Sequence, residues 1–271
     1  MDDPISSLEQ MKAAILKDAP RLTENDTFQF ACGKNSPCFT QCCADVNIAL
    51  TPYDVIRMRK YLGITSGEFL NRYTIVPFSK EQKFPFVLLK MRDNERKSCH
   101  FVGEEGCKIY ADRPWACRMY PIGVASPAAE EEETFYFIIN EDPCEGHGQG
   151  TKWSIASWMK DQRVDEYDAS GEEFKEITLN PLFQQGGTLK PAHMDMLFMV
   201  LYDQDKFRRF VFESSFLGKF NLTETEIEAA RDDDVELLRL GFRWLKFCLF
   251  GEKVLEVNEE VRQQKLNETV E

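Results

Sequence analysis

Eight cysteines in the first 150 residues are the side chains of this chain best suited to chemistry. Thiolates bind soft or borderline metals, such as zinc and the iron of iron–sulfur clusters. Four thiolates per site is the usual number for a structural zinc ion and for a 4Fe–4S cluster. The eight thiols therefore predict two four-ligand sites, or one site together with thiols that have a catalytic or other use. The eight are Cys32, Cys38, Cys42, Cys43, Cys99, Cys107, Cys117 and Cys144.

The odd number of cysteines, nine when Cys248 is included, argues against a disulfide framework. The N-terminal sequence MDDPISSLEQMKAAILKDAP lacks the basic start and the unbroken apolar stretch of a secretory signal. No run approaches the ~18–20 apolar residues that span a bilayer. We therefore expect a cytoplasmic protein, whose thiols are kept reduced and are available to bind metal.

The adjacent pair Cys42 and Cys43 indicates how the ligands divide. Neighbouring side chains point to opposite faces of a strand and lie about 100° apart on a helix. Two adjacent thiols are therefore poorly placed to serve one metal. The pair is better suited to two sites that lie close together along this segment.

Glycines and cations surround the predicted ligands. Glycines let backbone amides approach sulfur and donate hydrogen bonds to it. Cations offset the negative charge of four thiolates, although each is explained equally well as an ordinary surface charge. The glycines are Gly33, Gly103, Gly106 and Gly146, and the cations are Lys34, Lys108, Arg113 and Arg118.

Two histidines lie beside predicted ligands. His100 follows Cys99 directly, and His147 lies three residues after Cys144. Either is a possible ligand or a donor to sulfur, although a loop histidine without such a role is the commoner interpretation. Cys248 lies on an aromatic helix face, which is typical of a core residue.

Two cysteine motifs resemble the YkgJ-type cysteine-cluster family of zinc- or iron-chelating domains. The motifs are Cys32-x₅-Cys38-x₃-Cys42-Cys43 and Cys107-Lys-Ile-Tyr-x-Asp-Arg-Pro-x-x-Cys117-Arg-x-Tyr-Pro121. The resemblance covers roughly residues 30–147 and implies that all eight cysteines are metal ligands. It leaves the biological task of the metal undefined.

The spacing of the cysteines does not decide between zinc and iron–sulfur. Structural zinc sites favour Cys-x₂₋₄-Cys, and only the gap from Cys38 to Cys42 has that length. The Cys-x₂-Cys-x₂-Cys run of bacterial ferredoxins is missing from the sequence as well. We favour one or two 4Fe–4S clusters over zinc, because long gaps are commoner in cluster-binding folds.

The charge of the chain bears on its partners. The formal net charge is −13, which repels phosphate backbones and anionic membrane surfaces. We therefore expect neither nucleic acid nor membrane as a partner. The hydrophobic fraction of 43% and the charged fraction of 29% are ordinary for a globular protein.

Short strands and helices are expected to position the cysteines. A helix is predicted from about residue 5 to 17, and another begins with Thr51-Pro52 and ends at Gly63. A further helix is expected to begin near Ser66. Apolar alternation or continuous apolar runs predict strands over residues 46–50, 84–91 and 134–140. One turn of helix is expected after Pro114.

The second half of the chain has a different composition: cysteine is rare, and apolar residues recur with helical periodicity. Helices are predicted over residues 190–201, 203–212, 224–231 and 234–250. The predicted class is α+β, with a cysteine-cluster metal-binding domain over residues 1–150. A helical portion over residues 151–271 is expected to pack on it and to offer a surface for a protein partner.

Three functions are compatible with these features. The leading hypothesis is a metal- or iron–sulfur-binding protein in cytosolic redox or metal handling. The second is a cluster-dependent enzyme that modifies proteins, because related cysteine clusters occur in a flagellin lysine methylase. A radical mechanism with S-adenosylmethionine does not fit, since Asp45 stands where Cys-x₃-Cys-x₂-Cys needs a third cysteine. The third is a zinc-stabilised structural or interaction module.

Overall fold

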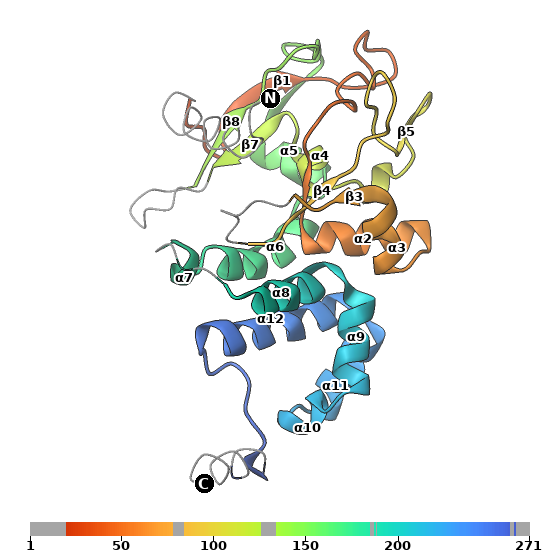
Figure 1. Cartoon of the computed structure of the whole chain (residues 1–271). Coiled ribbons are helices and arrows are strands. Elements are labelled where there is room, and N and C mark those ends of the chain that lie inside the picture. The colour runs from red at the N-terminus through yellow and green to blue at the C-terminus, as the bar shows by residue number, and fades with distance from the viewer. Residues whose placement is uncertain are drawn as a thin grey trace. The chain divides into compact units, whose positions relative to one another are not determined.

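The structure is a computed structural model, and it describes residues 20–77, 84–125, 134–184, 187, 189–260 and 263 (Figure 1). Helices and short strands both occur, so the predicted α+β class is confirmed. The helix predicted over residues 5–17 lies outside the described residues.

The described residues gather into two compact units, each built from segments that are separated in the sequence. Unit 1 takes its residues from 1–46, 92–110 and 115–166, and it contains all eight clustered cysteines. Unit 2 takes its residues from 47–91, 111–114 and 167–271. The predicted domain boundary at residue 150 stays a prediction.

Unit 1 is built on three antiparallel strand pairs. Strand β1 (Thr27–Phe30) pairs with β9 (Thr151–Ser154), in a register that sets Phe30 opposite Thr151. Strand β7 (Ile122–Ala125) pairs with β8 (Phe135–Ile138), which confirms the strand predicted over residues 134–140. Strands β5 (Val102–Gly103) and β6 (Gly106–Cys107) form a short hairpin. The pairing of β1 with β9 brings together the two ends of the cysteine-rich region.

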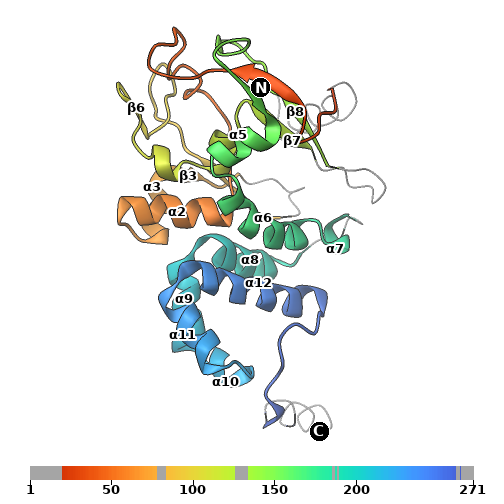
Figure 2. The ribbon, with the colours of Figure 1, turned by 180° about the vertical axis from the view of Figure 1, so that it is seen from behind.

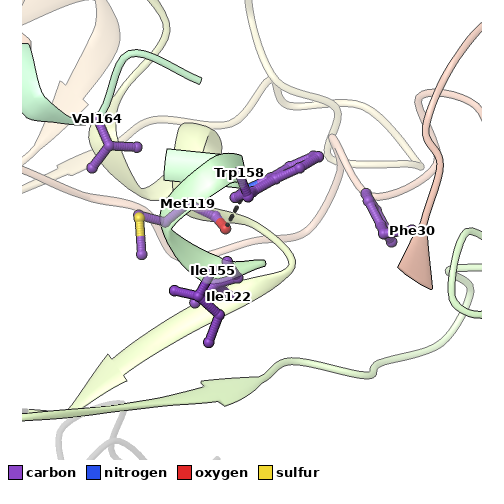
Figure 3. Close-up of a cluster of buried hydrophobic side chains, with 6 residues drawn as sticks. All are labelled: Phe30, Met119, Ile122, Ile155, Trp158 and Val164. Carbon is purple, nitrogen blue, oxygen red and sulfur yellow. Dashed lines mark hydrogen bonds between the residues drawn. The ribbon is translucent and has the colours of Figure 1, made fainter. Parts of the chain in front are cut away.

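A buried apolar cluster fixes the elements that carry the cysteines of unit 1 (Figure 3). Trp158, on α5 (Ile155–Asp161), donates its indole N–H to the backbone oxygen of Met119 at 3.2 Å. Met119 ends the predicted single-turn helix α4 (Trp115–Met119). The rings of Trp158 and Phe30 meet edge to face, with centroids 5.6 Å apart. The cluster consists of Phe30, Met119, Ile122, Ile155, Trp158 and Val164.

The first part of unit 2 follows the predicted capping signals closely. Helix α2 (Pro52–Leu62) begins with a capping box between Thr51 and Asp54, and it ends at Gly63 with φ of 64°. Helix α3 (Ser66–Tyr73) follows at once. Three short strands complete this part in the order β2–β4–β3, with β2 over Ala49–Leu50, β4 over Val87–Leu89 and β3 over Thr74–Ile75.

The rest of unit 2 is helical, and all four helices predicted there are confirmed. They are α8 (Pro191–Tyr202), α9 (Gln204–Glu213), α11 (Glu224–Asp232) and α12 (Asp234–Phe250). Helix α6 (Asp165–Thr178), α7 (Pro181–Gln184) and α10 (Phe216–Lys219) were not predicted. Figures 1 and 2 show α8 and α12 side by side. None of the helices in the described part of the chain is long and apolar enough to cross a membrane.

A buried ionic network joins α2, α9 and the start of α12 within unit 2. Asp234 accepts from Arg59 at 2.6 Å and from Arg208 at 2.7 Å, and Lys60 lies 3.4 Å away. The side chains of Asp234 and Arg59 are only 9% and 10% exposed. Burial acts to raise the pKa of Asp234, but the charges of Arg59, Lys60 and Arg208 outweigh it and lower that pKa.

We expect Asp234→Asn to lower the free energy of unfolding by about 3–5 kcal/mol, because it leaves the buried Arg59 and the half-buried Arg208 without a carboxylate. The carboxylate's contribution is present above its unfolded pKa of about 3.9 and is lost as pH falls through the lower folded value. The difference between wild type and variant should therefore shrink in acid. Urea denaturation followed by far-UV circular dichroism measures both effects.

Lys60→Ala is the matched control, because the lysine side chain is 47% exposed and its loss should cost less than about 1 kcal/mol. Equal losses for Asp234→Asn and Lys60→Ala would show that the buried network does not stabilise unit 2.

Candidate metal centre

The loop between β1 and Cys43 is a chain of tight turns. Backbone N–H groups bond to the carbonyl three residues earlier at Ser36 (2.9 Å), Phe39 (2.9 Å), Gln41 (2.9 Å) and Cys43 (3.2 Å). Thr40 has a left-handed φ of 65°. These turns fold the loop compactly, so four cysteines lie within a short stretch of backbone.

Four of the eight predicted ligands line one hollow of unit 1. They are Cys32, Cys38, Cys42 and Cys144, and Phe30 and Tyr120 supply its aromatic wall. The hollow has a volume of about 290 Å³, including solvent at its mouth. Cys38 is buried, Cys144 is half-buried, and Cys32 and Cys42 are exposed. Thiols that are far apart in the sequence thus share one partly open space.

Gly146 allows Cys144 to reach this hollow. The Gly146 carbonyl accepts a hydrogen bond from the N–H of Ala31, the residue directly after β1, at 3.1 Å. A Cβ atom on Gly146 would lie 2.5 Å from the Ala31 oxygen and 2.8 Å from the Phe30 ring. The neighbouring Glu145 N–H donates to the Cys38 sulfur at 3.3 Å. The close approach therefore joins the last cysteine to the first loop.

Tyr120 contributes a polar group to the same hollow. Its ring packs edge to face against Phe30, with centroids 5.9 Å apart. Its hydroxyl donates a hydrogen bond to the Cys144 sulfur. Burial and then this hydrogen bond raise the pKa of Tyr120, so the hydroxyl keeps its proton. Tyr120 belongs to a motif recognised in the sequence, but only the structure shows that it lies among the thiols.

A second group of thiols gathers around Cys43. The Cys99 N–H donates to the Cys43 carbonyl at 2.8 Å, and the neighbouring bridge pairs Ala44 with Ser98. Residues opposite each other in such a ladder present their side chains on one face. The charges of Cys117 and Cys99 both act on the Cys43 thiol. The backbone ladder therefore places Cys99 opposite Cys43.

Cys107 lies on the β5–β6 hairpin that follows Cys99. It pairs with Val102, and the Val102 N–H donates to the Cys99 carbonyl at 3.3 Å. Gly106 has φ of 104°, and a Cβ atom there would lie 3.0 Å from the Phe39 ring. The hairpin thus returns the chain to the side of Cys99 and packs on the first cysteine loop.

The thiols of Cys42 and Cys43 lie closer together than the sequence suggested. The Cys43 thiol donates to the Cys42 sulfur, which lowers the pKa of Cys42 to about 6 and raises that of Cys43. The side chains are therefore not turned to opposite faces as in a strand. The turn that bonds Cys43 N–H to the Thr40 carbonyl explains the difference.

Two cations that act on the thiols were not singled out in the sequence. Arg96 helps lower the pKa of Cys42, and Arg92 opposes the effect of burial, which raises the pKa of Cys99. Of the predicted cations, Arg118 donates to the Gln162 carbonyl at 2.7 Å, and Lys34 pairs with Glu105. In the sequence, Arg92 and Arg96 could have been noticed as basic residues shortly before Cys99.

The two histidines and Cys248, which were also considered in the sequence, each have different neighbours. The His147 ring lies 5.3 Å from the Phe30 ring, and its buried Nε2 has no hydrogen-bond partner among the described residues. The His100 carbonyl accepts from Arg92 at 2.6 Å. Cys248 is exposed on α12 in unit 2, so its interpretation as a core residue is wrong.

The hollow is lined by thiols, the donor type that binds zinc and iron–sulfur clusters. All nine cysteines are present as thiols, and backbone N–H groups approach Cys38 and Cys99. Within the described ranges, no three His, Cys, Asp or Glu side chains are grouped so as to hold a single ion. The residues that would hold the group are the cysteines lining the hollow, and metal would supply Lewis-acid or electron-transfer chemistry there.

The comparison with protein families covers this same region. Residues 31–145 match the CxxCxxCC family, described as a "putative zinc- or iron-chelating domain". The match thus lies within the cysteine-rich segment of the chain. The match begins one residue before Cys32 and ends one residue after Cys144, so the CxxCxxCC domain spans all eight cysteines. It confirms the predicted resemblance, and it supports metal binding with zinc or iron–sulfur both open.

No curated protein and no solved structure matches the chain. The CxxCxxCC match includes α2 and α3 of unit 2, but it does not reach the helices that follow residue 145.

We expect Gly146→Ala to reduce the metal content of the protein, because the added methyl group pushes the Cys144 segment away from Ala31 and Phe30. Overpacking of this kind costs about 1–3 kcal/mol. Elemental analysis of the purified chain measures the metal, and thermal denaturation measures the stability. Gly33→Ala is the control, since a Cβ atom on Gly33 would have no other atom within 4 Å. Equal metal content in the two variants would contradict the role given to Gly146.

Proposed function

We propose that this chain is a metal-binding protein that holds an iron–sulfur cluster or zinc through its eight cysteines. The proposed ligands are Cys32, Cys38, Cys42, Cys43, Cys99, Cys107, Cys117 and Cys144. The observation that carries the proposal is the convergence of Cys32, Cys38, Cys42 and Cys144 on one hollow within a CxxCxxCC domain. The proposed role is redox chemistry or metal handling in the cytosol.

A zinc ion and an iron–sulfur cluster require different arrangements of the four sulfurs. Tetrahedral zinc holds each sulfur at about 2.3 Å, which draws four sulfurs to within about 4 Å of one another. A cluster instead occupies a volume of its own and is bound by thiolates spread around it. Metal and sulfide analysis of the protein distinguishes the two arrangements.

Hydrogen bonds to sulfur support a redox role. The Glu145 N–H reaches the Cys38 sulfur at 3.3 Å, and the Phe101 N–H reaches the Cys99 sulfur at 3.4 Å. The Tyr120 hydroxyl donates to Cys144. Donors of this kind set the reduction potential of an iron–sulfur cluster, because they stabilise the state with more negative charge.

The test is the absorption spectrum and the metal content of the full chain purified without oxygen. We expect a brown protein with broad visible absorption, and iron accompanied by an equal amount of acid-labile sulfide. A colourless protein with stoichiometric zinc would support the metal site but contradict the redox role. A chain that holds no stoichiometric metal, even after reconstitution, would contradict the proposal.

In the iron-loaded protein, we expect Tyr120→Phe to lower the reduction potential by on the order of tens of millivolts, without loss of iron. The variant removes a donor that favours the more negative, reduced state, but it leaves all thiols in place. Potentiometric titration measures the shift. Tyr110→Phe is the control, since Tyr110 is 61% exposed. Indistinguishable potentials in the two variants would show that the Tyr120 hydroxyl does not act on the site.

A further inference from the structure

The stretch between Cys107 and Cys117 does not belong to unit 1 throughout. Residues 111–114 fold with unit 2, although the residues directly before and after them belong to unit 1. These four residues are the Ala-Asp-Arg-Pro part of the motif that joins the two cysteines. Asp112 lies five residues after Cys107 and five before Cys117. A contact that fixes Asp112 therefore acts on both cysteines through short lengths of chain.

One arginine of unit 2 holds Asp112. Arg57, on α2, donates from its Nε to the Oδ1 of Asp112 at 2.8 Å, and its Nη2 lies 2.7 Å from the same oxygen. The side chains of Arg57 and Asp112 are only 23% and 19% exposed, so water and salt screen this ion pair only in part. The two residues are 55 positions apart, so the pair is a tertiary anchor and not a local turn contact.

Two tyrosines fix the direction of the Arg57 side chain. Arg57 donates to the Tyr53 hydroxyl, one helical turn earlier on α2, at 3.2 Å. Its guanidinium carbon lies 5.8 Å from the centroid of the Tyr53 ring and 5.6 Å from that of Tyr167, which is within the range of cation–π attraction. The two rings meet edge to face, with centroids 5.0 Å apart. A planar guanidinium held in this way is already oriented toward the carboxylate.

Helix α4, which carries Cys117, is anchored on its other side within unit 1. Arg118 and Met119 are hydrogen-bonded to the segment formed by α5 and the residue that follows it, at 2.7 and 3.2 Å. These two bonds follow Cys117 in the chain, whereas the bond of Asp112 precedes it. The backbone on both sides of Cys117 is therefore fixed.

We propose that Arg57 is a positioning residue for the cysteine segment, because it fixes the chain between Cys107 and Cys117 through Asp112. The inference rests on the proposed function, and it adds a residue of unit 2 to those that support metal binding. An anchored ligand loses less conformational freedom when metal binds, so the metal is held more tightly. By reciprocity, bound metal strengthens the contact of Arg57 with Asp112, which couples metal binding to unit 2.

The test follows metal retention by the full chain, purified without oxygen, in increasing concentrations of EDTA. Arg57→Met and Asp112→Asn should each release metal at about tenfold lower chelator, as when a supporting contact of a metal ligand is removed. The double variant should release metal no earlier than either single variant, because both changes break one contact. Arg57→Lys should lie between wild type and Arg57→Met, since lysine keeps the charge but not the planar fork.

Arg72→Met is the matched control within unit 2. Arg72 also forms an ion pair, with Glu68 at 2.5 Å, and its guanidinium carbon also lies over a tyrosine, 5.1 Å from the Tyr73 ring centroid. None of these residues belongs to a cysteine motif, so this variant should retain metal as the wild type does. Equal losses from Arg57→Met and Arg72→Met would show only a general weakening of unit 2 and would overturn the proposal.

Thiol labelling of the metal-free chain separates this inference from the proposed function. N-ethylmaleimide labelling and peptide mass spectrometry give the rates for Cys107 and Cys117, with the exposed Cys32 as the internal reference. Arg57→Met should speed both rates severalfold relative to Cys32, at a temperature where far-UV circular dichroism shows the variant to be folded. Unchanged relative rates would overturn the proposal. A wild-type chain that binds no metal, together with the expected change in labelling, would refute the proposed function while supporting the anchor.

Discussion

The arrangement of unit 1 depends on the antiparallel pairing of β1 with the chain that follows Cys144. Phe30 pairs with Thr151 in the strand and with His147 just beyond it, and Ala31 bonds to Gly146. Without these contacts, Cys144 would have no defined position relative to the loop that carries the first cysteines. The buried Phe30 ring ties the same strand to Trp158 and thereby to the end of α4. One strand pair thus orders both the core and the hollow.

Residues 47–91 belong to unit 2, and a second pairing of distant segments closes unit 1 where the chain returns to it. Ala44 is bridged to Ser98, so the chain leaves and re-enters unit 1 at neighbouring points. This closure places Cys99 opposite Cys43. Segments far apart in the sequence are therefore joined at two places, and each place carries cysteines. The CxxCxxCC match spans residues 31–145, so it covers the second closure and the residues between its two strands, and it ends just short of the strand pair β1–β9.

The helices of unit 2 could be predicted because their signals are local. Thr51 and Gly63 begin and end α2 through their own backbone geometry, and Asp233 caps α12 with its side chain. The set of thiols around the hollow could not be predicted, since it depends on strand pairing between distant segments. The adjacent pair Cys42 and Cys43 was expected to divide between two sites, whereas a tight turn brings their two thiols into contact.

The central claim is that sulfur from this chain binds the metal. X-ray absorption at the metal edge of the full chain, purified without oxygen, tests this claim most directly because it reports the atoms around the metal. Cysteine ligation predicts a first shell of sulfur at about 2.3 Å, with a further metal–metal shell if iron–sulfur clusters are present. A first shell dominated by nitrogen and oxygen would contradict it.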